Sequence, residues 1–128
     1  MPRCDLPLFA IIFAGLGLTG LGSPAMAADP GAGKAVFSSQ CSICHSPEPG
    51  TNRVGPSLFG VFGRKAGAVP GYSYSPAMKD SNLVWDEANL NKYLESPRTV
   101  VPGTKMPYAG LKDDTKRANL IAYLATLK

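Results

Sequence analysis

The sequence predicts an all-α fold, in which short helices are joined by long ordered loops. Helical patterns occur near both ends of residues 28–128, and most glycines and prolines after residue 27 lie between residues 47 and 110. The apolar patches in that middle region are short, so we expect no substantial sheet. A loop-rich domain of this size buries little of its own surface, and a large bound group would stabilise it.

The first 27 residues are predicted to be a signal peptide that is cleaved, leaving one domain over residues 28–128. Arg3 precedes an apolar run over residues 6–22, and Ala25-Met26-Ala27 provides a small-residue cleavage site. Cys4 leaves with this leader. The alternative is an uncleaved membrane anchor, because the run is only slightly shorter than the roughly 20 residues of a membrane span. The glycines in the run favour removal, and the expected location is the periplasm.

The formal net charge of +4 is modest, and it stays the same when the leader removes Arg3 and Asp5. A basic excess of this size suits electrostatic steering toward an acidic protein surface. The chain has no run of basic residues interleaved with aromatic ones, so we do not expect nucleic acid binding.

The first helix is predicted to begin at Asp29 as N-cap and Pro30 as its first residue. Gly33 lies inside this helix, where it costs about 1 kcal/mol relative to alanine. Two explanations remain open at this point: a second backbone approaches Gly33 closely, or the first turn is frayed.

The other predicted elements follow from capping residues. Ser75-Pro76 is expected to begin one short turn through Lys79, and Asp86 to cap a helix over residues 87–95. Pro97 is interpreted as a helix stop, with residues 98–112 as loop. The last helix is predicted to begin at Asp113 or Asp114. Its apolar stripe would comprise Ala118, Leu120, Ile121, Leu124, Ala125 and Leu127.

The stretch "CSICH" contains the chain's only histidine and both cysteines of the predicted mature chain. Residues i, i+3 and i+4 share a helix face, so Cys41, Cys44 and His45 are expected to project together from the end of the first helix. A zinc site needs four ligands, of which the mature chain offers three, and no acidic residue has ligand spacing. A redox dithiol is expected at the start of a helix in a βαβ unit, which this pattern lacks.

C-x-x-C-H is the attachment signature of c-type haem, and this interpretation is favoured. Two thiols one turn apart can form thioether bonds to the porphyrin, and the adjacent imidazole then becomes the proximal iron ligand. Met78 and Met106 are the remaining methionines that could supply a sixth ligand. Met106 is favoured because Pro102-Gly103 and Pro107 restrict its loop, and Thr104 could help to fix it by hydrogen bonding. Met78 could instead simply fill a gap.

Over nearly all of residues 28–128, the sequence resembles the class I cytochromes c, particularly the mitochondrial-like small bacterial carriers. The resemblance rests on Gly33, Phe37, Trp85, "CSICH", "VGPSLFGVFGRKAG", "PGYSYSPAMK", "YLESPR", "PGTKMPYAG" and "LIAYL". It implies the class I fold, with crossing N- and C-terminal helices and loops wrapped around one covalently bound haem c. Gly33 and Phe37 would then pack against Leu120 and Tyr123.

The resemblance also implies roles for individual residues. Met106 would be the sixth ligand, and the carbonyl of Pro56 would orient His45. Tyr74 and Trp85 would bind the haem propionates with Arg64 nearby, Tyr93 and Thr104 would lie near the Met106 sulfur, and Tyr108 would pack at the haem edge. On residue type alone, Trp85, Tyr93 and Tyr108 are better explained as ordinary core, and Arg64 as a solvated charge.

Three positions depart from the family pattern. Met78 stands where many relatives have asparagine in the haem pocket, which makes the pocket more apolar. Gln40 and Thr99 replace lysines of the mitochondrial members, so the docking face is less basic than theirs.

The resulting expectation is a soluble, monomeric electron carrier and not an enzyme. It would carry electrons from a cytochrome bc1-type complex to a terminal oxidase or a photosynthetic reaction centre, docking through Arg53, Arg98, Lys105 and Lys112. One alternative is a peroxidase or gas-binding protein with a labile sixth ligand, although the chain lacks a distal histidine. The other is a cytochrome tethered by its leader.

Overall fold

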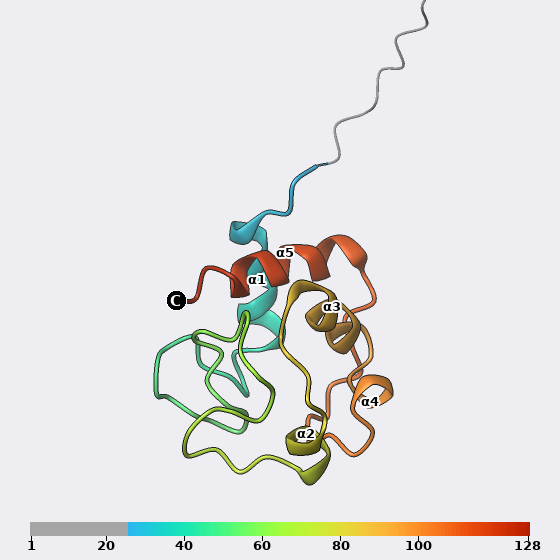
Figure 1. Ribbon diagram of the computed structural model, residues 1–128. Helices are drawn as coiled ribbons and strands as arrows, with labels where there is room; N and C mark the ends of the chain where they lie inside the picture. The colour runs from blue at the N-terminus through green and yellow to red at the C-terminus, as the bar shows by residue number, and fades with distance from the viewer. Residues whose placement is uncertain (1–25) are drawn as a thin grey trace, which may run out of the picture.

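The computed structural model describes residues 26–128 and shows five helices with an isolated β-bridge between Lys65 and Val84. The predicted cleavage site therefore lies at the edge of the described residues, and the rest of the predicted leader lies outside them. The prediction of an all-α fold is confirmed. Within residues 26–128, no helix has both the length and the apolar character needed to cross a bilayer. In chain order the helices are α1 Pro30–Gln40, α2 Pro76–Asp80, α3 Glu87–Glu95, α4 Pro97–Val100 and α5 Asp114–Leu124 (Figure 1).

Helix α1 begins where the sequence predicts. The Asp29 side chain accepts a hydrogen bond from the Gly31 amide at 2.8 Å, and Pro30 occupies the first turn. The Asp29 amide also donates to Asn119 Oδ1 at 2.8 Å, which ties the start of α1 to α5.

The end of α1 differs from the prediction, because the helix stops at Gln40 and the cysteine motif lies in a turn beyond it. The Cys41 and Ser42 amides both donate to the Phe37 carbonyl, at 2.8 and 3.0 Å, which interrupts the regular i to i−4 ladder. The His45 amide then bonds the Cys41 carbonyl at 2.9 Å. The motif is thus still wound as a single turn, although it is not part of the helix.

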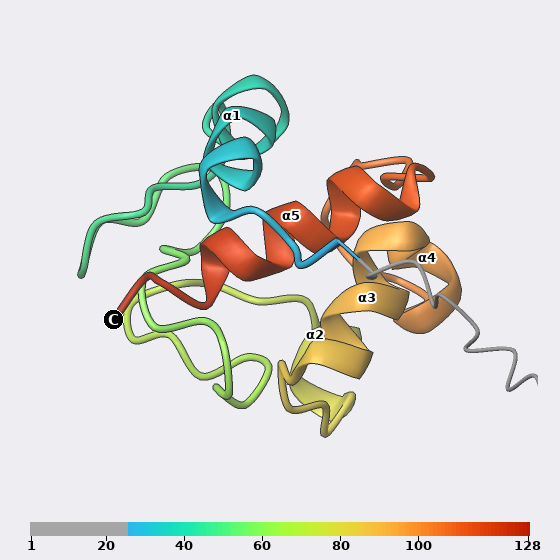
Figure 2. The same ribbon diagram turned by 90° about the horizontal axis from the view of Figure 1, so that it is seen from above.

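Helices α1 and α5 cross in direct contact near the two ends of the described chain (Figures 1 and 2). A Cβ atom on Gly33 would lie 1.9 Å from the Asn119 carbonyl oxygen and 2.8 Å from Tyr123 Cβ. The Phe37 and Tyr123 rings pack beside this point with centroids 5.4 Å apart. Close backbone approach, and not a frayed turn, therefore accounts for the glycine.

Helix α5 begins at Asp114 with Asp113 as its N-cap, but its buried face differs from the predicted stripe. Ala118 is exposed, and Arg117 is buried at 4% exposure. The Arg117 guanidinium donates to the Leu111 carbonyl at 2.7 Å, Asn91 Oδ1 at 2.7 Å and Asp114 Oδ1 at 2.5 Å. A guanidinium with an acceptor at each of its three nitrogens can be buried, so charge alone is a poor guide to the inward face of this helix.

The starts of α2 and α3 are confirmed, whereas α4 was predicted as loop. Ser75 caps α2, and Asp86 caps α3 by accepting from the Asn89 amide at 2.8 Å. Pro97 ends α3 as expected but also begins α4, whose single turn is closed by the Val101 amide and the Pro97 carbonyl at 2.9 Å. A proline at the first position of a helix loses no intrahelical bond, so the same residue serves both purposes.

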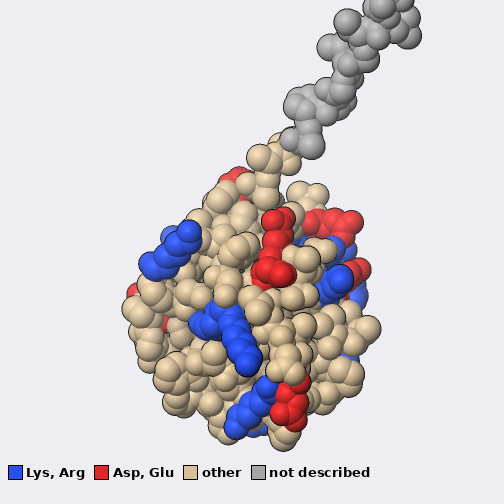
Figure 3. Space-filling model, viewed as in Figure 1, with Lys and Arg blue, Asp and Glu red and all other residues tan. Residues whose placement is uncertain are grey.

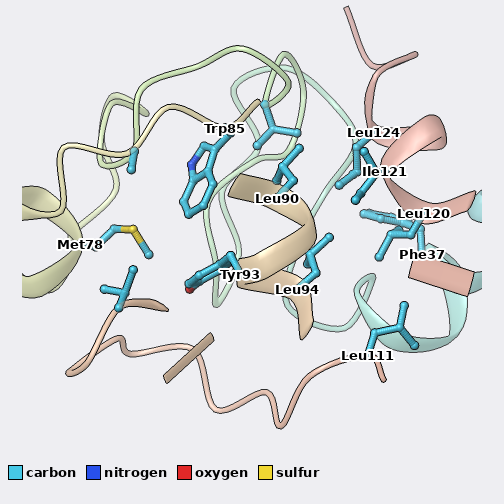
Figure 4. Close-up of a cluster of buried hydrophobic side chains, with 13 residues drawn as sticks. Phe37, Met78, Trp85, Leu90, Tyr93, Leu94, Leu111, Leu120, Ile121 and Leu124 are labelled. Carbon is cyan, nitrogen blue, oxygen red and sulfur yellow. The ribbon is translucent and has the colours of Figure 1, made fainter. Parts of the chain in front are cut away.

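Helix α3 lies at the centre of the buried cluster, between two groups of side chains (Figure 4). Leu90 and Leu94 project toward Phe37 and the leucines and isoleucine of α5, whereas Trp85, Tyr93 and Met78 form the opposite side. The Trp85 and Tyr93 rings have centroids 4.8 Å apart. This second group borders the functional site.

The Gly33 contact predicts a large effect of adding one methyl group. Gly33→Ala would push the Asn119 backbone away from α1, and we expect the free energy of unfolding to fall by about 2–3 kcal/mol. Guanidinium titration of the haem-loaded protein measures this. Gly31→Ala is the matched control, because its Cβ would meet only Asp29 Oδ1 at 3.2 Å, and we expect a change below about 1 kcal/mol. Equal stability of the two variants would contradict the predicted clash.

Candidate functional site

A cavity of about 590 Å³ lies between the cysteine turn, the loops that follow it, helices α2 and α3, and the segment around Met106. All the residues predicted to bind the cofactor line it, although they come from five separate stretches of the chain. They are Cys41, Cys44, His45, Pro56, Arg64, Tyr74, Trp85, Tyr93, Thr104 and Met106. Met78 and Tyr108 line the same cavity.

His45 is oriented from two sides. Its Nδ1 lies 2.7 Å from the Pro56 carbonyl oxygen, and since a carbonyl can only accept, Nδ1 carries the proton. Gly55 lies directly beneath the ring, because a Cβ atom there would be 2.4 Å from His45 Cε1. Burial lowers the pKa of His45, although the bond to Pro56 opposes this. The imidazole is therefore neutral, and its Nε2 retains the lone pair that a metal requires.

The two cysteine thiols are not arranged as a reactive dithiol. In the unmodified polypeptide, burial raises the pKa of Cys41 to about 11, and the nearby Cys44 adds to this rise. Redox-active cysteines instead have lowered thiol pKa values. The environment of Cys41 therefore disfavours the dithiol alternative, and it is compatible with a thiol that is consumed in a thioether bond.

Arg64 is not a solvated surface charge. Its Nη1 donates to the Phe59 carbonyl at 2.9 Å and its Nη2 to the Ser57 carbonyl at 3.1 Å. Its Nε is buried and has no hydrogen-bond partner among the described residues. Burial lowers the pKa of Arg64, with Tyr74 opposing this. A buried N–H without an acceptor is costly, so a bound group that brings an anionic oxygen to this edge of the cavity would satisfy it.

Tyr74 is half-buried beside Arg64 and accepts a hydrogen bond from the Val69 amide at 3.2 Å. It packs edge-on against Tyr72, with ring centroids 4.7 Å apart. Burial raises the pKa of Tyr74, so its hydroxyl keeps its proton at neutral pH and can donate to a group in the cavity.

Met106 is held by a small polar cluster inside the cavity. Thr104 Oγ1 accepts from the Met106 amide at 3.3 Å and lies 3.0 Å from the Tyr93 hydroxyl. The Tyr93 hydroxyl is also 3.9 Å from Met106 Sδ. Burial raises the pKa of Tyr93, with the Thr104 bond opposing this, so the phenol is a neutral donor. The thioether therefore has a defined position next to an apolar wall.

Met78 belongs to that apolar wall. It is buried and projects toward Trp85 and Tyr93 (Figure 4). The Met78 amide is used in capping α2, through Ser75 Oγ at 3.1 Å. Both methionines left open by the sequence thus border the cavity, but only Met106 lies in a segment with a hydroxyl donor at its sulfur.

Gly55 was not recognised from the sequence as a site residue. Its importance follows from the close approach of the His45 ring, which depends on how the loop folds back. The Gly55 amide also donates to the Cys44 carbonyl at 2.7 Å, so the same residue fixes the turn that carries the histidine. A glycine immediately before Pro56 was the available signal in the sequence.

The four cations predicted to steer docking have different surroundings. Arg53 Nη1 donates to the Ser42 carbonyl at 2.9 Å, over the cysteine turn, and Lys105 Nζ to the Ser73 carbonyl at 3.1 Å, beside the cavity. Lys112 bonds the Glu95 carbonyl at the end of α3, and Arg98 is exposed on α4. On the face in Figure 3, lysine and arginine are interspersed with acidic groups and form no broad patch.

Comparison with known proteins indicates what kind of group the cavity holds. The Cytochrome c family model matches residues 31–128. The chain is a member of the cytochrome c family. It is 51% identical over 96 residues to cytochrome c from Euglena viridis, covering 75% of this chain and 94% of that protein. It is 51% identical over 117 residues to cytochrome c2 from Rhodomicrobium vannielii, covering 91% of this chain and 93% of that protein.

A solved structure shows the same fold. Cytochrome cH from Methylobacterium extorquens superposes with a TM-score of 0.73 at 46% identity, covering 77% of this chain and 99% of that one. The class I cytochrome c fold predicted from the sequence is thereby confirmed. This cytochrome carries one haem c, attached through Cys41 and Cys44, and it is an electron carrier and not an enzyme.

The residues present fit such a group. The cavity is enclosed mainly by apolar and aromatic side chains, the neutral His45 ring offers an unprotonated nitrogen, and the Nε–H of Arg64 lacks an acceptor. A flat apolar macrocycle with a metal at its centre and carboxylates at one edge would satisfy all three.

Proposed function

We propose that this cytochrome is a soluble, exported single-electron carrier that binds haem iron through His45 Nε2 and Met106 Sδ. The observation that supports this most strongly is that one cavity receives both a neutral imidazole bonded to the Pro56 carbonyl and a thioether that lies 3.9 Å from the Tyr93 hydroxyl. These contacts hold the two side chains in place before and after electron transfer, which keeps the reorganisation energy small.

Haem supplies a one-electron redox couple when it is bound. The protein residues decide how that couple is used. With His45 and Met106 as ligands, no coordination position would be left for a substrate, so the site would support electron transfer and not substrate binding at the metal. A soft thioether ligand and an apolar pocket both favour the ferrous state, and both therefore raise the reduction potential.

Arg64, Tyr74 and Trp85 are proposed to hold the carboxylates of the group. The argument rests on Arg64, whose guanidinium is anchored on the Ser57 and Phe59 carbonyls while its Nε–H remains without an acceptor. Met78 has a different role in this proposal. It fills the wall beside Trp85 and Tyr93 with an apolar side chain and is not a ligand.

Met106→Ala and Met78→Ala distinguish the two methionines. We expect Met106→Ala to keep its covalent haem but to lose the near-infrared sulfur–iron charge-transfer band, lower the potential and bind carbon monoxide in the ferrous state. Met78→Ala is the matched control, because it removes a buried methionine from the same cavity, and it should retain the band. Absorption spectroscopy and potentiometry measure these effects.

The same spectra also include outcomes that would contradict the assignment of Met106 as the sixth ligand. If Met78→Ala abolished the band, Met78 would be the ligand and the assignment of Met106 would be wrong. Rapid and complete carbon monoxide binding by the unmodified ferrous protein at neutral pH would favour the peroxidase or gas-binding alternative, because that function needs a labile sixth position.

The proposed partners are a cytochrome bc1-type donor and a terminal oxidase or photosynthetic reaction centre as acceptor. Arg53, Lys105 and Lys112 each donate to a backbone carbonyl, which restricts their side chains near the surface, and Arg98 is exposed. Preorganised cations of this kind attract the acidic surface of a partner protein, and they lose little side-chain entropy when that partner docks. The protein is proposed to act as a monomer.

Electrostatic docking predicts a rate that falls with ionic strength. Lys105→Gln should lower the second-order rate constant for reduction by an isolated bc1-type complex by about two- to fivefold at low salt, and should flatten its salt dependence. Lys34→Gln, on the exposed side of α1, is the control for the loss of one charge. Equal effects of both variants would show that net charge, and not the cavity edge, steers the encounter.

Export is proposed from the leader over residues 1–27, with the mature protein located in the periplasm. The intact mass of the protein from its native source tests this, because loss of the leader lowers the mass and haem attachment raises it. We expect one haem on a chain that begins at Ala28. Recovery of the full-length chain in the membrane fraction would instead support the tethered alternative.

A further inference from the structure

The segment that carries Met106 has few connections to the rest of the protein. Among the described residues, no backbone N–H or C=O of residues 105–110 takes part in a backbone–backbone hydrogen bond. The nearest such bonds are Thr104 to Val101 at 3.0 Å and Leu111 to Leu94 at 2.7 Å, one on each side of the segment. The position of the segment therefore depends on side chains, because segments with few internal bonds open easily.

Besides the contact of the Tyr93 hydroxyl with the Met106 sulfur, side-chain hydrogen bonds tie this segment and the adjoining Thr104 to the protein at three places. Thr104 and Tyr93 meet inside the cavity at 3.0 Å, and Lys105 Nζ bonds the Ser73 carbonyl at 3.1 Å. The third tie is a hydrogen bond from the Tyr108 hydroxyl to Gln40 Oε1. The first two involve residues that precede Met106, whereas Tyr108 is the tie that follows it.

The Tyr108–Gln40 bond joins two residues that line the cavity. They come from positions 68 residues apart. Gln40 is the last residue of α1 and adjoins the haem-bearing Cys41, while Tyr108 follows Met106 by two residues. The bond thus connects the part of the chain that is covalently fixed to the haem with the segment that supplies the proposed sixth ligand.

We propose that Tyr108 and Gln40 act as a latch that keeps the Met106 segment closed, and that they thereby set how often Met106 leaves the iron. This inference rests on the proposed ligation by Met106. Tyr108 and Gln40 are positioning residues, since they act on Met106 through the backbone of its segment. Opening is a reversible ligand dissociation, with no covalent or redox change.

The expected size of the effect follows from the bond that is lost. A neutral hydrogen bond contributes about 0.5–1.5 kcal/mol net, which corresponds to about a two- to twelvefold change in the opening equilibrium. The neighbouring Tyr93–Thr104 contact remains, so the segment should stay closed most of the time in a variant that lacks the latch. The latch therefore affects the frequency of opening and leaves the resting coordination intact.

The test is the binding of imidazole to the ferric protein, followed by stopped-flow absorption. At saturating imidazole, the observed rate constant reaches the rate of Met106 dissociation. We expect Tyr108→Phe and Gln40→Ala each to raise that limiting rate by about three- to tenfold. The double variant should be no faster than either single one, because both changes remove the same bond.

Tyr123→Phe is the matched control. It also removes one phenolic hydroxyl, and the Tyr123 hydroxyl makes no hydrogen bond among the described residues; its ring packs on Phe37, away from the Met106 segment. We expect its limiting rate to equal that of the unmodified protein. An increase equal to that of Tyr108→Phe would overturn the latch.

The remaining outcomes separate the latch from the proposed ligation. Unchanged rates in Tyr108→Phe and Gln40→Ala, or effects that add in the double variant, would overturn the latch while the sulfur–iron band of the unmodified protein still supported Met106. Absence of that band in the unmodified protein would instead refute the ligation itself.

Discussion

The architecture depends on one close contact, the crossing of α1 and α5 at Gly33. Because no side chain separates the two backbones there, the helices near the ends of the described chain meet without intervening atoms. Asp29 and Phe37 extend the contact to either side, through Asn119 and Tyr123. With these helices fixed, the cysteine turn that follows α1 has a defined place relative to α3, and the long middle loops can line a cavity without having to form a core.

The cavity occupies space that packed side chains would fill in an ordinary domain of this size. The buried apolar side chains lie mostly around α3 and α5, and the wall made by Met78, Trp85 and Tyr93 faces the cavity. In the proposed arrangement haem is part of the protein interior as well as its redox group, since it would fill the space between the loops and give the buried Arg64 Nε–H an acceptor. This explains how a chain rich in glycine and proline maintains ordered loops.

Local chemistry made the helix starts predictable. Asp29, Ser75 and Asp86 each cap a helix as expected, and the last helix begins at Asp114, one of its two predicted starts, because capping depends mainly on neighbouring residues. Two features were missed for different reasons. Helix α4 was missed because Pro97 both ends one helix and begins the next. The burial of Arg117 was missed because it depends on three acceptors that the tertiary fold brings to its guanidinium. The haem-attachment motif was evident from its spacing. The restricted loop alone favoured Met106 with Thr104 beside it, whereas the roles of Arg64 and Tyr93 followed from the resemblance, because no local pattern places those two residues at the cavity.

The burial of the Arg64 Nε–H has a consequence for the folding of the newly synthesised chain. Before haem is attached, a compact polypeptide would have to enclose an empty cavity and the buried Nε–H of Arg64, which has no acceptor. Both features oppose the collapse of the chain. A newly synthesised chain is thereby biased toward an uncompacted state. Under the proposed export, that state would suit passage through a secretion channel, compaction would accompany haem attachment, and a chain that failed to receive haem would stay open to proteolysis.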